Sequence, residues 1–150
     1  MRRALTIDEA FYGNDQPGGV TTRLNNLAQL LQATNRLDEA EPLMRRALAM
    51  SEAIYDISSP NIAGYLQNLA MLLQDTNRLD KAEPLMRRAI IIYVEYMKKI
   101  GSEHPDLEIA LTNYTDLLLT MGRSDAEMRT IFKVLLAPIP NFYRATLAPE

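Results

Sequence analysis

Apolar residues recur along most of this chain at the three- and four-residue spacing of an α-helix. Two such stripes consist of Leu24, Leu27, Ala28 and Leu31, and of Leu66, Leu69, Ala70 and Leu73. This spacing places each stripe on one face of a helix. The pattern predicts an all-α protein with helices near 1–13, 21–34, 38–56, 61–76, 80–100, 106–121 and 124–136.

The chain also repeats itself at an interval of 42 residues. Segment 34–47, TNRLDEAEPLMRRA, recurs at 76–89 as TNRLDKAEPLMRRA, and the two copies differ only at Glu39 and Lys81. The stretch beginning at Leu24 matches the one beginning at Leu66 at the same interval. An internal repeat of this length indicates supersecondary units that stack and bury a shared core.

A third unit is recognisable but altered, and the chain opens on half a unit. Asn113 continues the pattern of the first helices, whereas Gly122 replaces the asparagine of the turn. Terminal repeats are usually atypical, because one of their faces has no neighbouring unit. We expect a single repeat domain over 1–137, with a half unit at 1–20, units at about 21–60, 61–105 and 106–137, and a tail at 138–150.

Short turns join the two helices of each unit. Asn35 and Asn77 suit a left-handed residue after the first helix, and Gly122 suits it better. Asp38 and Asp80, each followed three residues later by glutamate, predict capping boxes at the second helices. Clusters of turn residues predict loops between the units at 14–19, 58–61 and 101–106.

These motifs resemble the long-unit tetratricopeptide repeats of kinesin light chain and its bacterial relatives. The resemblance is carried by 24–28, 37–43 and 46–48, by their copies one unit later, and by the loop at 101–105. It covers about residues 1–127, and the near-identity of two units favours a bacterial array. It implies a right-handed superhelical solenoid of antiparallel helix pairs with small residues at the helix crossings: Ala28, Ala40, Ala47, Ala70, Ala82 and Ala89. A HEAT-like solenoid is the alternative fold, but these alanines and the short turns favour tetratricopeptide packing.

The resemblance further implies a groove, lined by the first helices, that binds a peptide or a partner protein. When the apolar stripes face inward, the groove positions are Thr22, Asn25, Asn26, Gln29, Gln67, Asn68, Met71, Thr112, Asn113 and Asp116, together with Gln32, Ala33, Gly64, Gln74, Asp75, Ile109, Leu119 and Thr120. Asn26, Asn68 and Asn113 share one register and form a predicted ladder of amides. Amides can bind a peptide backbone because each offers donors and an acceptor. Alternatively, the same amides bond neighbouring helices and have a purely structural role.

Composition narrows the possible functions. The 16 basic and 19 acidic residues give a net charge of −3, which disfavours general nucleic-acid binding. The chain has no cysteine and one histidine, His104, so it cannot form a Cys-ligated zinc site or a His-pair metal site, and we expect no cofactor. Apolar runs are all much shorter than the roughly 18 residues that span a bilayer, so we expect a cytoplasmic protein without a membrane segment.

Individual polar residues favour structural roles over catalysis. Glu41 and Glu83 each precede an arginine by four residues, which predicts ion pairs on one helix rather than phosphate contacts. His104 lies in a proline-containing loop and is expected to cap it. Five tyrosines, at 55, 65, 93, 96 and 114, are expected to pack between helices with their hydroxyls near solvent. Groove positions carry no basic residue, so recognition of an acidic chain terminus is not expected, and no nucleophile–base pair indicates an enzyme.

Two other functions remain open. The chain starts on a second helix without its first-helix partner, so Leu5, Ile7 and Phe11 would need cover from another helix pair or another chain. This favours a structural module that oligomerises through its open N-terminal helix. A regulatory fragment of an enzyme or transcription regulator is also compatible with the repeats.

Overall fold

The computed structural model describes residues 17–141, and the structural statements below refer to this range. It contains α2 (Pro17–Ala33), α3 (Leu37–Ile54), α4 (Pro60–Asp75), α5 (Leu79–Ile100), α6 (Asp106–Thr120) and α7 (Asp125–Leu135). The all-α prediction is confirmed, and five of these six helices match their predicted bounds within two residues. The helix expected at 1–13 lies outside the described residues.

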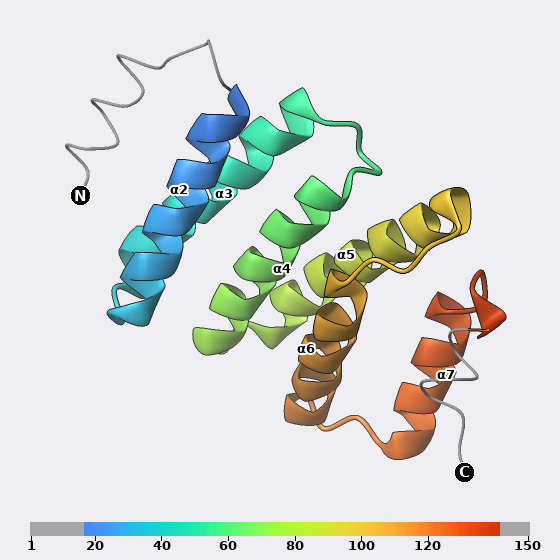
Figure 1. Ribbon diagram of the computed structural model, residues 1–150. Helices are drawn as coiled ribbons and strands as arrows, with labels where there is room; N and C mark the ends of the chain where they lie inside the picture. Colours follow the sequence, from blue (N-terminus) through green and yellow to red (C-terminus); the bar gives the residue numbers. More distant parts are fainter. Residues whose placement is uncertain (1–16, 142–150) are drawn as a thin grey trace.

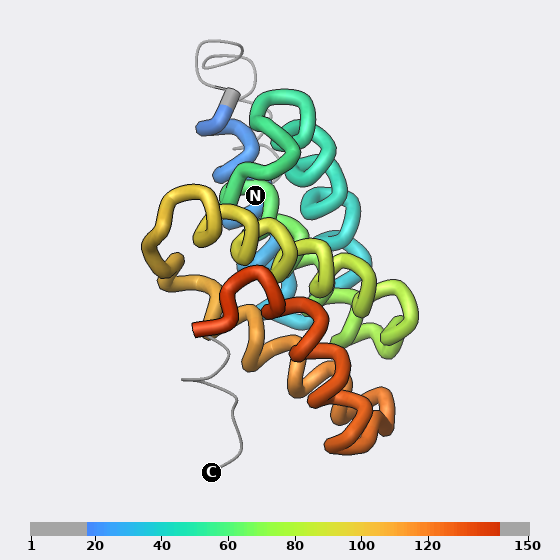
Figure 2. Tube along the Cα trace, turned by 90° about the vertical axis from the view of Figure 1, so that its right-hand side faces the viewer, coloured from blue at the N-terminus to red at the C-terminus, as the bar shows by residue number. Residues whose placement is uncertain are grey.

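The helices form successive hairpins, α2–α3, α4–α5 and α6–α7, and these stack side by side (Figure 1). Each later hairpin packs its first helix on the second helix of the hairpin before it, since α3 contacts α4 and α5 contacts α6. The first helices also touch one another, α2 with α4 and α4 with α6. Figure 2 views this stack from its C-terminal side, with α7 nearest the viewer. The result is a solenoid in which each hairpin contacts its sequence neighbours.

Alanines allow the helices to approach closely where they cross. All six predicted crossing residues are fully buried: Ala28, Ala40, Ala47, Ala70, Ala82 and Ala89. Larger apolar side chains fill the space between the crossings, and one core cluster extends from Ala28 to Leu136. Because this core runs through all three hairpins, no hairpin buries its apolar stripe alone.

The turns within hairpins have the predicted backbone. Asn35 and Asn77 have φ values of 61° and 60°, and Gly122 has a φ of 82°. At the first turn, the N–H of Arg36 donates to the carbonyl of Leu31 at 2.8 Å, and that of Asn35 donates to a carbonyl in the same last turn. This pair of bonds is a Schellman motif, which satisfies carbonyls that the helix itself leaves free.

The capping boxes predicted at Asp38 and Asp80 are wrong. Helices α3 and α5 begin earlier, at Leu37 and Leu79, and the residue before each makes no side-chain cap. Both aspartates therefore lie inside the first turn. Their negative charge is favourable there, because the N-terminal end of a helix carries partial positive charge.

A capping box does occur at α7, where none was predicted. The hydroxyl of Ser124 accepts from the N–H of Glu127 at 3.2 Å, and the carboxylate of Glu127 accepts from the N–H of Ser124 at 3.1 Å. The sequence does carry the required spacing, serine followed three residues later by glutamate.

Helix α2 begins within the segment 14–19, which was predicted to be a loop. Pro17 suits the first helical position, because its missing N–H would be unpaired there in any case. The carbonyl of Gly18 accepts from the hydroxyls of Thr21 and Thr22 at 2.9 and 2.8 Å. A Cβ at Gly18 would lie 2.8 Å from the hydroxyl oxygen of Tyr55, so the glycine makes room for the end of α3.

The third hairpin is more open than the others. The backbones of α6 and α7 approach each other less closely than those of α2–α3 or α4–α5 (Figure 1). Tyr114 of α6 and Phe132 of α7 meet edge to face between them, with ring centroids 5.8 Å apart. Beyond α7, Leu136 is buried and Ile139 packs on the core, so the predicted tail at 138–150 begins with a packed segment.

Candidate functional site

The first helices present one polar face, formed by the outward side chains of α2, α4 and α6, which we call the groove face. Of the predicted groove residues, eleven are exposed: Thr22, Asn26, Gln29, Ala33, Met71, Asp75, Ile109, Thr112, Asp116, Leu119 and Thr120. Five are half-buried, Gln32, Gly64, Asn68, Gln74 and Asn113, and two are buried, Asn25 and Gln67. The periodicity therefore identified the face but not the burial of each position.

Asn25 and Gln67 were predicted to lie on the groove face, but both are buried. Their exposed fractions are 9% and 8%. The two residues occupy equivalent positions, 42 residues apart, on the flank of the helix next to the following first helix. That flank is covered because adjacent first helices pack on each other, which a single-helix pattern does not reveal.

The asparagine register reaches back to the preceding unit. The side-chain amide of Asn68 donates to the Oδ1 of Asn25 at 3.1 Å. Asn113, at the same register, donates to the sulfur of Met71 at 3.7 Å. Both bonds join neighbouring first helices, which is the structural role posed as the alternative. A ligand-binding role for the ladder, including the exposed Asn26, remains a prediction.

Further side-chain bonds cross the junction between α2 and α4. The amide of Gln32 donates to the Oδ2 of Asp75 at 2.7 Å, and the hydroxyl of Tyr65 donates to that of Thr21 at 3.1 Å. With the bond between the asparagines, three polar bridges connect these two helices along their length. The groove face is therefore continuous from α2 to α4.

The junction between α4 and α6 is hollow. A cavity of about 170 Å³ opens there, lined by Met71, Gln74, Asp75, Asn113 and Asp116. Thr120 stands at the register that Asp75 occupies in α4, and its hydroxyl donates to the carbonyl of Asp116 in its own helix at 2.8 Å. Asp75, by contrast, receives the amide of Gln32 from the neighbouring helix. All five lining residues are among the positions that the sequence assigned to the groove.

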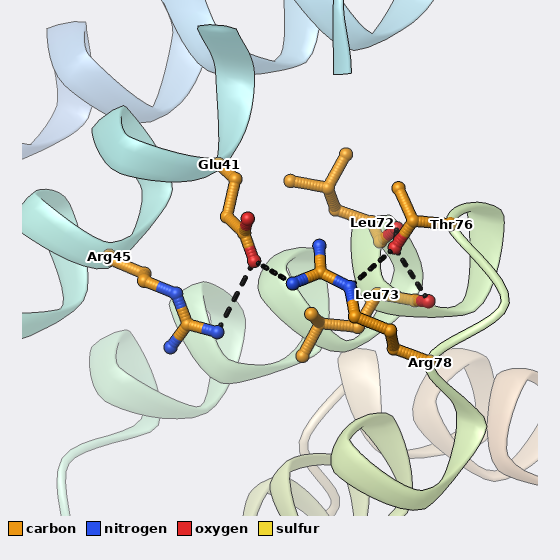
Figure 3. A network of polar contacts seen from close by, with 6 residues as sticks. All are labelled: Glu41, Arg45, Leu72, Leu73, Thr76 and Arg78. Carbon is orange, nitrogen blue, oxygen red and sulfur yellow. Dashed lines mark hydrogen bonds and ion pairs between the residues drawn. The ribbon is translucent and has the colours of Figure 1, made fainter. Parts of the chain in front are cut away.

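On the second helix of the first unit, Glu41 binds two arginines (Figure 3). Its Oε1 lies 3.3 Å from Arg45, the predicted pair, and 2.7 Å from Arg78 of the next unit, which was not predicted. Arg78 also donates to the hydroxyl of Thr76 at 3.0 Å, and that hydroxyl donates to the carbonyl of Leu73. The hydrogen bond from Arg78 holds the pKa of Glu41 below its ordinary value, against the opposing effect of partial burial.

The equivalent glutamate of the second unit has different partners. Glu83 pairs with Arg87, as predicted, and also accepts from the hydroxyl of Tyr114 at 2.7 Å. Burial, and then this hydrogen bond, raise the pKa of Tyr114 to about 12. The expectation that this hydroxyl lies near solvent is wrong, because α6 brings Tyr114 onto the buried side of α5.

His104 caps a loop, as expected. Its Nδ1 accepts from the N–H of Asp106 at 3.1 Å, at the start of α6. Its ring lies against Tyr93 and Tyr96, with centroid distances of 4.8 and 5.4 Å. These contacts give His104 a structural role in the loop before α6.

A larger cavity, of about 590 Å³, was not predicted. It lies between the loop joining α3 to α4 and the last residues of α5, and is lined by Asp56, Ser58, Ser59, Pro60, Glu95, Tyr96, Lys98, Lys99 and Ile100. Helix α5 has 22 residues against 18 in α3, which leaves its end uncovered. Its charged lining residues are two acidic ones, Asp56 and Glu95, and two basic ones, Lys98 and Lys99.

Comparison with known proteins identifies the repeat. The sequence profile of the tetratricopeptide repeat matches residues 21–93. No curated protein matches this chain. Within the described residues, no helix has the length and hydropathy needed to cross a membrane, and no cluster of three or more metal-ligating side chains occurs. Residues 21–93 thus carry tetratricopeptide repeats, and they lie within an all-α solenoid of stacked helix hairpins.

Proposed function

We propose that this protein is a non-catalytic interaction module whose groove face binds a peptide or an extended segment of a partner protein. Tetratricopeptide repeats are in general protein–protein interaction modules. The observation that carries the proposal for this face is the hollow between α4 and α6, which lies among exposed polar side chains of the first helices. A concave surface with convergent polar groups is the usual form of a binding site.

Gly64 adds a second supporting observation. It lies on the same helix face as Met71, two turns earlier, and a Cβ built on it meets no atom within 4 Å. The space above this part of α4 is therefore open to a ligand. Exposed amides on the neighbouring helix α2, at Asn26 and Gln29, could pair with the donors and acceptors of a peptide backbone.

Blocking this space tests the proposal. Gly64→Tyr should fill the groove face, since the Cβ that it adds meets no atom within 4 Å, and it should not destabilise the fold, because glycine is a poor helix former. The matched control is Ala49→Tyr, which adds the same side chain at an exposed position of α3. Dodecapeptides selected from a random display library on the wild-type chain should bind Ala49→Tyr normally and lose binding to Gly64→Tyr. Selected peptides that all bind Gly64→Tyr as well as wild type would refute the proposal.

We also infer that the chain is of the kinesin light chain-like, bacterial type and is cytoplasmic. The 42-residue interval and the near-identical units support the subtype. Oligomerisation through the helix predicted at 1–13 remains a separate prediction, since Leu5, Ile7 and Phe11 lie outside the described residues. A constant monomer mass at rising concentration in sedimentation equilibrium would contradict it.

A further inference from the structure

We propose that the partner segment is basic, and that one of its lysine or arginine side chains inserts into the cavity between α4 and α6, with its charged head between the carboxylates of Asp75 and Asp116. This inference rests on the proposed function and specifies the chemistry of the ligand. The predicted ligand is therefore a cationic peptide, whose charge is opposite to that of an acidic chain terminus.

Charge is the first argument. Two of the five lining residues are aspartates, and none of the five is a cation. The remaining exposed groove positions of the described first helices are all uncharged: Thr22, Asn26, Gln29, Ala33, Ile109, Thr112, Leu119 and Thr120. A cation that balances this local negative charge would therefore come from the partner, and complementary charge of this kind selects partners and speeds their encounter.

The second argument is the donor and acceptor balance. Asp75 already accepts from Gln32 through Oδ2, which orients its carboxylate. A carboxylate has about four lone-pair sites, so Asp75 retains capacity for another donor. Asn113, which also lines the cavity, directs one amide N–H to the sulfur of Met71, and its side-chain oxygen is a further acceptor. A cavity rich in acceptors matches an ammonium or guanidinium group, which only donates.

Size and apolar surface are the third argument. Pockets for drug-sized ligands measure about 300–1,000 Å³. At about 170 Å³ this cavity suits a single side chain. Met71 is 38% exposed at its wall, and Ile109, one turn before Asn113, is 54% exposed. Lysine and arginine bury their aliphatic stems against such surface while the charged head stays among polar groups.

The arrangement is specific to one junction. Between α2 and α4, Gln29 stands in place of Met71, and Gln32 bridges to Asp75 across the gap. The partner segment is therefore expected to need one basic residue at a defined position, rather than a regular series of basic residues.

The test uses the dodecapeptides selected on the full wild-type chain. We expect lysine or arginine to be enriched at one aligned position. A fluorescein-labelled selected peptide should lose about ten-fold or more in affinity for Asp75→Asn/Asp116→Asn, measured by fluorescence anisotropy. The control variant, Glu95→Gln/Glu103→Gln, removes the same charge at two exposed positions away from the groove face and should change affinity less than about two-fold.

A double-mutant comparison separates a direct contact from a general charge effect. The same peptide with its conserved basic residue replaced by methionine should bind weakly, and equally, to wild type and to Asp75→Asn/Asp116→Asn. Circular dichroism of each variant checks that the helices are intact.

The outcomes distinguish the two proposals. Selected peptides that lack a basic residue, ignore Asp75→Asn/Asp116→Asn and still lose binding to Gly64→Tyr would overturn this inference and leave the proposed function standing. If no selected peptide is sensitive to Gly64→Tyr, both proposals fail.

Discussion

The second helices of the first and second units begin with almost the same residues, yet the glutamate that they share meets different surroundings in each. Glu41 has a side chain 21% exposed and binds Arg78 from the turn of the next unit. Glu83 has a side chain 11% exposed and binds the hydroxyl of Tyr114 from the next first helix. Segments 34–47 and 76–89 differ at one position only, so the difference must come from the unit that follows.

That following unit differs at one key position. In the second unit, Leu69 occupies the place at which the third unit has Tyr114. The tyrosine reaches Glu83 with its hydroxyl and Phe132 with its ring, and α6 and α7 lie farther apart around these rings. The repeated residues thus specify a hairpin, while a few unrepeated residues decide how one hairpin joins the next.

The largest expected effect is at the contact between α5 and α6. Tyr114→Ala removes a fully buried ring and its bond to Glu83, and should lower the free energy of unfolding by about 3–5 kcal/mol. Tyr65→Ala, which removes a half-buried tyrosine between α2 and α4, should cost less. Urea unfolding followed by circular dichroism measures both, and an equal or larger loss for Tyr65→Ala would contradict this reading of the junctions.

The two glutamates provide the sharpest form of the comparison. Glu83→Gln should cost about 1–3 kcal/mol, because it weakens hydrogen bonds in a buried network. Glu41→Gln should cost less than about 1 kcal/mol, since the side chains of its arginine partners, Arg45 and Arg78, are 52% and 34% exposed and solvent screens the pairs. The same urea measurement applies. Equal losses of unfolding free energy in the two variants would mean that the following unit does not change what this glutamate contributes to stability.

A third difference lies at the helix starts. Ser124→Ala removes the capping box of α7 and should cost about 1 kcal/mol. Helix α5 lacks a side-chain cap, so Asp80→Ala should remove only a charge–dipole interaction, worth about 0.3–1 kcal/mol. Thermal unfolding of the two variants would rank them, and a larger loss for Asp80→Ala would count against the assigned cap.

The smallest expected effect is a pH dependence of the stability that the ion pair between Glu41 and Arg78 contributes. The folded pKa of Glu41 is below its ordinary value of 4.5. A depressed folded pKa contributes stability above the ordinary pKa, and this stability is lost as the pH falls through the folded value. The stability difference between wild type and Glu41→Gln should therefore be constant near neutral pH and shrink below about pH 4.5. A difference that grows in acid would show that Arg78 does not stabilise the carboxylate.

Local features of the chain were predictable because they depend on residues close in sequence. Helix positions follow from apolar periodicity, and the left-handed Asn35 and Asn77 follow from turn chemistry. The predicted capping boxes failed although their residues are present, because α3 and α5 begin earlier than Asp38 and Asp80. Helix starts are hard to place by pattern alone, since packing can add or remove a turn.

The candidate site was only partly predictable. Periodicity placed Met71, Asn113 and Asp116 on one face, and the structure brings them around one cavity. The same periodicity could not show that Asn25 is buried, because its cover comes from the next first helix. It could not show a cavity either, since the hollow depends on which side chains of two helices bridge the space between them.

The sequence by itself determined the repeat, the helix hairpins, their turns and the polar face of the first helices. Each of these depends on backbone preference and on side chains within one unit. Only the tertiary structure decided the contacts between units: the bond from Arg78 to Glu41, the burial of Tyr114, and the hollow between α4 and α6. These contacts join residues about 30–45 positions apart, and their energies depend on distances and solvent exposure that exist only once the hairpins have packed.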